Sequence, residues 1–84
     1  MRTIMLDGSL YKSKQELHEA LKRLLSLPEY YGMNADALHD CLSENPSAVN
    51  LWVADKGIGE VALAVETVEA VFSDLGGDVK ELNL

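Results

Sequence analysis

Two aspartates one helical turn apart are the side chains whose type and spacing point most directly to chemistry. Asp36 and Asp40 would place both carboxylates on one face of a helix, where like charges cost about 0.2–0.5 kcal/mol. His39 and Ser43 would share that outer stripe. No lysine or arginine occurs between residues 24 and 55, so the sequence supplies no local countercharge. The pair therefore predicts either a solvated acidic face or a surface that takes positive charge from a partner.

Two consecutive tyrosines just before this helix add aromatic surface to the acidic stripe. Tyr30 and Tyr31 are followed by Gly32, and the two adjacent rings cannot both enter a core. We therefore expect one ring to face solvent as a rigid contact of the kind enriched at interface hot spots. Asn34 belongs to the residue types that cap helices, so the helix should begin directly after it. The inward face would carry Ala35, Leu38, Cys41 and Leu42.

The reactive residue types in this segment do not form a catalytic group. Cys41 and His39 lie two residues apart, on different faces of a helix, so no nucleophile–base pair is expected. Asp36, His39 and Asp40 could in principle bind a metal, but the other histidine, His18, falls on a different predicted helix. The sequence also lacks a glycine-rich phosphate loop. We therefore expect no enzymatic activity, no metal and no cofactor.

The composition restricts the kind of partner. The chain has 84 residues, 48% of them apolar, which suffices for one small domain over residues 1–84. Fourteen acidic and seven basic side chains give a net charge of −7, which disfavours nucleic acid or an anionic membrane as partner. Five of the seven basic residues lie among the first 23, so part of the surface should carry one sign. The balance favours a basic partner, although good solubility would also explain it.

The cysteine content and the lack of long apolar runs indicate the compartment. A single cysteine excludes an intrachain disulfide. The first residues run into Asp7-Gly8 without the apolar stretch of a secretory signal. No apolar run approaches the ~18 residues that span a bilayer. A reducing cytoplasm is therefore the expected location.

Local signals predict alternating strands and helices in the order β-α-α-β-α-β. Ser13 and Glu16 form a capping box, Pro28 ends the helix that follows, and Gly76-Gly77 ends a later one. Helices between strands favour parallel pairing with right-handed crossovers, so we predict a single α/β domain with a three-stranded parallel sheet covered by helices. The elements are a buried strand over 1–6, helices over 14–25 and 35–44 with a break at Asn45-Pro46-Ser47, a strand over 48–53, a helix over 61–75 and a strand over 79–84.

The segment around the tyrosines and aspartates resembles the barstar family, intracellular inhibitors of the extracellular ribonuclease barnase. The resemblance rests on Leu-Pro-Glu-Tyr-Tyr-Gly at 27–32, on Asn34, and on Asp-Ala-Leu at 36–38 followed by Asp-Cys-Leu at 40–42. It is strongest over residues 1–42, and Leu51-Trp52 and Val71-Phe72 are later anchors. The resemblance implies an inhibitor whose helix and preceding loop enter and cover the ribonuclease active site.

The resemblance also implies roles for individual residues. Asp40 would be the central anchor, with its carboxylate where a substrate phosphate sits, facing the arginines and histidine of the enzyme. Asp36 would pair with a basic group at the rim, and Tyr30 would stack on the catalytic histidine. Gly32 and Asn34 would shape the loop and supply close polar contacts.

Other positions lie at the rim of the implied site or differ from the family pattern. Asp74 falls where the family has a glutamate that adds a peripheral charge pair. His39 stands where the family has a tryptophan, Asn45 replaces another aromatic residue and Gly77 replaces a second cysteine. These changes affect the rim more than the centre. They point to a related inhibitor whose cognate ribonuclease need not be barnase itself.

We therefore expect a cytoplasmic monomer that forms a 1:1 heterodimer with a basic, secreted-type microbial ribonuclease, as in toxin–antitoxin pairs. An acidic module, or an immunity protein for a basic partner that is not a nuclease, would use the same face and remains the alternative. The expected partner-binding residues are Tyr30, Tyr31, Gly32, Asn34, Asp36, His39, Asp40, Ser43 and Asp74.

Overall fold

The computed structural model describes residues 2–44 and 48–82 and confirms the predicted order of elements. A short 3₁₀ turn, η1 (Gly8–Leu10), follows the first strand. The break predicted at 45–47 and the end of the strand predicted over 79–84 lie outside the described residues. The elements are β1 (Arg2–Asp7), α1 (Lys14–Leu25), α2 (Ala35–Ser43), β2 (Val49–Asp55), α3 (Gly59–Asp74) and β3 (Val79–Glu81).

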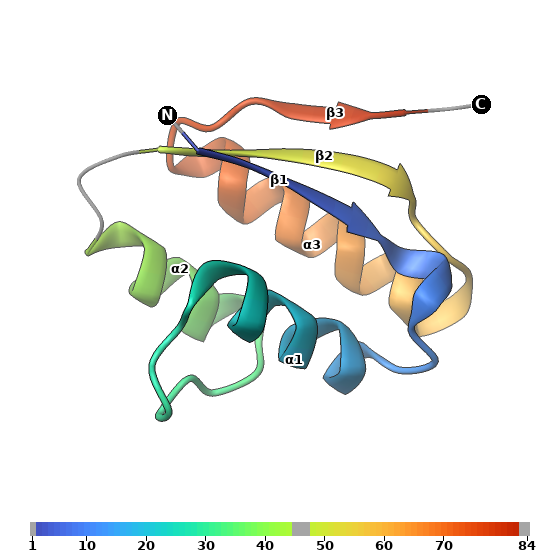
Figure 1. The fold of residues 1–84 in the computed structure, drawn as a ribbon, viewed down its shortest axis with the longest axis horizontal. Coiled ribbons are helices and arrows are strands. Elements are labelled where there is room, and N and C mark those ends of the chain that lie inside the picture. The colour runs from blue at the N-terminus through green and yellow to red at the C-terminus, as the bar shows by residue number, and fades with distance from the viewer. Residues whose placement is uncertain (1, 45–47, 83–84) are drawn as a thin grey trace.

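The three strands form a parallel sheet in the order β1-β2-β3, as predicted. Ile4 lies opposite Leu51, and Leu51 lies opposite Val79. Because the strands follow one another in chain order, two right-handed crossovers must wind to the same side. Figure 1 shows this result, with α1, α2 and α3 all on one side of the sheet. The helices therefore cover a single face.

The uncovered face of the sheet explains a difference from the sequence prediction. The first strand was expected to be buried throughout, but it alternates between buried Ile4 and Leu6 and an exposed Met5, which is 52% exposed. On the same open face Lys80 lies 5.4 Å from the ring centre of the half-buried Trp52. The prediction was correct for the position of the strand and wrong for its burial, because only one side is packed by helices.

The core lies between the sheet and the three helices. Fully burying each large apolar side chain contributes about 1.5–3 kcal/mol, so this layer supplies most of the stabilising free energy. At Gly77 a Cβ atom would lie 2.0 Å from the carbonyl oxygen of Val49, so the turn into β3 requires glycine there. The largest fully buried side chains are Leu6, Leu17, Leu21, Leu38, Leu51, Val53, Val65, Val68 and Phe72.

Candidate functional site

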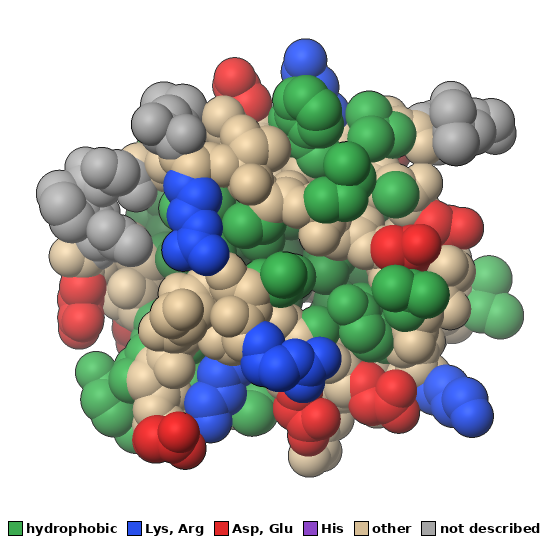
Figure 2. Space-filling model, in the orientation of Figure 1, with side chains coloured by type: hydrophobic (Ala, Val, Ile, Leu, Met, Phe, Trp, Pro, Cys, Tyr) green, Lys and Arg blue, Asp and Glu red, His purple; other side chains and the backbone are tan. Residues whose placement is uncertain are grey.

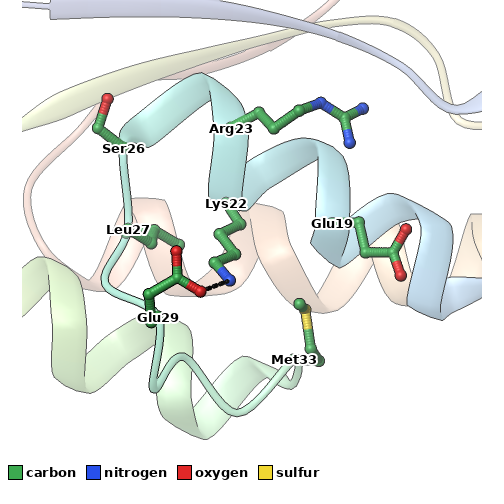
Figure 3. A pocket seen from close by; sticks show the side chains of 7 residues that line it. All are labelled: Glu19, Lys22, Arg23, Ser26, Leu27, Glu29 and Met33. Atoms are coloured by element: carbon green, nitrogen blue, oxygen red, sulfur yellow. Dashed lines mark hydrogen bonds and ion pairs between the residues drawn. The ribbon is translucent and has the colours of Figure 1, made fainter.

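The loop between α1 and α2 is held in place by its own turns and by α1. Ser26 ends α1 in a left-handed conformation with φ of 54°, and the Tyr31 amide donates to the Pro28 carbonyl at 3.0 Å. Lys22 Nζ lies 3.3 Å from Glu29 Oε2 (Figure 3), and both side chains line a pocket of about 480 Å³. Because Glu29 is fully exposed, this ion pair contributes little to holding the loop, and the backbone turns fix its course.

The two tyrosines point in opposite directions, which confirms that only one faces solvent. Tyr30 is 78% exposed, whereas Tyr31 is 4% exposed and belongs to the core. The Tyr31 hydroxyl lies 2.6 Å from Nδ1 of His18, a buried side chain on α1. Tyr31 was predicted to bind the partner. The structure buries its ring, which a partner therefore cannot contact directly. Tyr31 can support binding only by holding the loop in place.

His18 is a residue of the site that sequence reasoning did not assign. Burial, followed by the nearby Lys14 charge, lowers the pKa of His18, and burial raises the pKa of Tyr31. Both side chains are therefore neutral near pH 7. A His18 ring protonated on Nδ1 can donate to the Tyr31 oxygen, which in turn donates to the Asn34 carbonyl at 3.4 Å. This chain links α1 to the start of α2.

The His18 ring should titrate below its ordinary pKa of about 6.5. As the pH falls the unfolded chain takes up this proton first, so the stabilising contribution of a neutral His18 is lost below about pH 6.5. Proton NMR of the ring C–H resonances measures the titration, and the His39→Gln variant assigns the signals. A His18 midpoint at or above 6.5 would contradict the buried, neutral assignment.

Asn34 and Gly32 set the geometry with which the chain enters α2. Asn34 Oδ1 accepts from the Ala37 amide at 2.8 Å, which confirms the predicted cap, and its Nδ2 donates to the Gly32 carbonyl at 3.1 Å. A Cβ on Gly32 would lie 3.2 Å from Cβ of Ala37, so a larger residue would press on the first helical turn. Met33 has a φ of 57°, a left-handed conformation that no local signal predicted.

The outer stripe of α2 carries the predicted acidic residues. Asp36 and Asp40 are both exposed, and the hydroxyl of Ser43 donates to the Asp40 backbone carbonyl at 2.9 Å. His39 Nε2 lies 4.0 Å from Asp74 Oδ2, so the fold brings the end of α3 beside α2. Within residues 2–44 and 48–82, neither Asp36 nor Asp40 forms an ion pair.

The basic side chains of α1 form no ion pair with this stripe in the part of the chain that the structure describes, although Lys14 lines a pocket with Asn34 and Ala35 at the start of α2. Lys14, Lys22 and Arg23 are on α1, and Figure 2 shows lysine and arginine side chains on the face of the molecule that carries α1. The acidic excess is therefore unevenly spread, because α1 carries three basic and two acidic side chains, whereas α2 carries Asp36 and Asp40 and no lysine or arginine. Such an arrangement would orient an approaching basic partner toward α2.

The groups at this site that could support chemistry other than binding are the Cys41 thiol and clusters of metal-ligating side chains. Burial raises the pKa of the partly buried Cys41 thiol, and the charges of Glu44 and Asp40 raise it further, so the sulfur is a poor nucleophile. Among the described residues no group of three His, Cys, Asp or Glu side chains is placed to hold a metal ion. None of the helices described is both long and apolar enough to cross a membrane.

Comparison with known protein families identifies the chain. Residues 1–83 match the family described as Barstar (barnase inhibitor). The protein belongs to the barstar family. It is also similar to the protein named "Putative ribonuclease inhibitor YrdF" from Bacillus subtilis (strain 168), with 49% identity over 43 residues. This alignment covers 51% of the present chain and 47% of the relative, about half of each.

Membership of the barstar family confirms the resemblance seen in the sequence and extends it over the length of the chain. The barstar family is one of inhibitors, which confirms the prediction that the protein is not an enzyme. Of the predicted partner-binding residues, the structure places Asp74 of α3 next to His39 of α2. It leaves Tyr30 exposed in the loop before α2 and buries Tyr31 in the core.

Proposed function

We propose that this protein inhibits a basic ribonuclease of the secreted, barnase type by filling its active site with α2 and the preceding loop. The observation that carries the proposal is the exposed stripe of Asp36 and Asp40, which has no ion-pair partner in the described residues and follows the exposed Tyr30 of the preceding loop. Inhibition would take place in the cytoplasm, as a 1:1 complex that protects cellular RNA, as in a toxin–antitoxin pair.

The physical basis of inhibition is mimicry of a phosphate by a carboxylate. A ribonuclease must present Arg, Lys and His to the phosphates of RNA, and a carboxylate forms the same charge-assisted, often bidentate, hydrogen bonds. In this arrangement Asp40 occupies the position of the central phosphate. Asp36 pairs with a basic group at the rim of the cleft. The Tyr30 ring then stacks on the catalytic histidine.

The remaining site residues would act at the edge of the complex. Gly32 and Asn34 hold the loop close enough for backbone contact with the enzyme. His39, Ser43 and Asp74 lie along or beside the outer stripe, where they would meet the rim of the cleft. Substitutions there should change the choice of ribonuclease more than the strength of the central contact.

The deciding experiment titrates the protein into a barnase-type ribonuclease and follows RNA cleavage. Loss of activity that is complete at one equivalent supports a stoichiometric block, and RNA should compete with the inhibitor for the enzyme. A basic partner that is not a nuclease is the second candidate, because the same acidic face would bind it. Binding to a basic protein that RNA does not weaken would favour that candidate.

The association rate with the ribonuclease should fall steeply as salt is added. An acidic stripe without countercharge steers a basic partner, and steering raises association rates by about 10–10³-fold at low salt, a range for which barnase–barstar is itself a reference case. Stopped-flow fluorescence between about 0.01 and 1 M ionic strength measures the effect. A rate that stays flat over that range would contradict steering.

A further inference from the structure

A cluster of charged side chains joins α3 to the edge strand β3, and none of its members belongs to the acidic stripe of α2. Lys56, in the loop before α3, lies 3.3 Å from Glu66 Oε1 and 2.9 Å from Glu81 Oε2. Glu66 belongs to α3 and Glu81 to β3, so a single lysine bridges two elements. Lys56, Glu66 and Glu81 together carry a net charge of −1.

Glu69 is the unusual member of this cluster. It follows Glu66 on α3, and its Oε2 atom is buried without a donor to satisfy it. Glu66 lies three residues before it on α3, and Lys56 brings Glu81 to Glu66, so the Glu69 carboxyl faces the Glu81 carboxylate. If Glu69 were ionised, two carboxylates would face each other and neither could donate a hydrogen bond. A protonated Glu69 can donate its O–H to Glu81.

Burial is the largest cause that raises the pKa of Glu69, to about 7, and Glu81 and Glu66 raise it further while Lys56 lowers it. These three groups, from α3, β3 and the loop before α3, are the charged groups that face Glu69. Lys56 and the contact with Glu69 lower the pKa of Glu81, which therefore stays ionised as the acceptor. The buried, unpartnered Oε2 atom and the crowding of three carboxylates around one lysine therefore both favour a proton on Glu69.

We propose that Glu69 is protonated in the folded protein, that it donates this hydrogen to Glu81, and that loss of the proton at higher pH loosens β3. The strand is short and lies at the edge of the sheet, so few backbone hydrogen bonds hold it and a side-chain clamp adds to them. Its backbone bonds include Leu51 N–H to the Asp78 carbonyl at 2.8 Å and Leu82 N–H to the Val53 carbonyl at 2.7 Å. On ionisation the proton passes to water and the net charge of the cluster becomes −2.

The direction of the pH effect follows because the pKa of Glu69 is higher in the folded protein than in the unfolded chain. Between about pH 4.5 and 7 the folded protein holds the proton and the unfolded chain does not, so the contribution to stability is full below 4.5 and is lost as the pH rises through 7. The Glu81 contribution has the opposite sign, but it is lost only below pH 4.5.

The test compares wild type with Glu69→Gln, which keeps a neutral donor at every pH. From pH 6 to 8 the unfolding equilibrium constant of wild type should rise by up to about tenfold more than that of Glu69→Gln. Chemical denaturation at each pH measures these constants. Hydrogen exchange, corrected for its intrinsic rate, should show β3 amides losing protection over the same range in wild type only.

Glu60→Gln is the matched control, because Glu60 is an exposed glutamate on the first turn of the same helix and does not face Glu69. Its Oε2 atom accepts from the Lys14 amide at 3.0 Å, and the oxygen of a glutamine can still accept that bond. This variant should follow the pH profile of wild type. Carbon NMR of the Glu69 carboxyl gives an independent reading, with a midpoint near 7 expected. Parallel profiles for wild type and Glu69→Gln, or a midpoint near 4.5, would overturn the proposal.

Discussion

Replacing Asp40 with alanine should weaken binding to the ribonuclease by about 2–5 kcal/mol, the usual effect of truncating one member of a buried charge pair, for which barnase–barstar is itself a reference case. Asp40 is exposed on α2, and no ion pair within the described residues engages it. In the complex its removal would leave the enzyme's arginines unpaired inside a desolvated cleft. Isothermal titration calorimetry at fixed salt measures the loss.

Two further variants make this result specific to the site. Asp36→Ala should weaken binding less, because the rim remains accessible to water. Glu19→Ala removes the same charge from an exposed position on α1 and should leave affinity unchanged. All three variants should retain the free energy of unfolding of wild type, since none of these side chains belongs to the core. Equal affinities for Asp40→Ala and Glu19→Ala would place the binding site elsewhere.

Replacing Tyr31 with alanine should lower the free energy of unfolding by about 3–5 kcal/mol, the range for deleting a buried aromatic ring. The ring fills the core beneath the loop, and its hydroxyl bonds to His18 at 2.6 Å. The substitution would therefore open a cavity and leave a buried imidazole without its partner. Denaturation in urea at pH 7 measures the change, and affinity should fall with it because the loop loses its anchor.

The neighbouring tyrosine provides the matched control for this prediction. Tyr30→Ala should leave stability almost unchanged, since the ring is exposed, but should weaken binding through the loss of a contact. Tyr31→Phe keeps the ring and removes only the hydroxyl, which should cost about 1–3 kcal/mol of stability. A Tyr31→Ala variant as stable as Tyr30→Ala would contradict the assignment of Tyr31 to the core.

Features that depend on neighbours along the chain could be predicted well. The Asn34 cap, the end of α1 near residue 25 and the exposed aspartates of α2 are all present in the structure. Capping and helical periodicity are properties of residues three or four positions apart, so a short stretch of sequence contains the physical information that they need. The order of elements and the parallel sheet follow from the same local signals.

Features that depend on segments far apart in the sequence could be seen only in the tertiary structure. The sequence predicts that one tyrosine faces solvent, but the burial of Tyr31 in the loop brings it against His18, thirteen residues earlier on α1. Asp74 lies near His39 because α3 packs against α2, and Glu69 faces Glu81 because α3 also packs against β3. Local patterns thus determine which helices and strands form and which face of each is apolar. Crossover handedness and close packing then decide which side chains meet, because those contacts join residues that carry no information about one another along the chain.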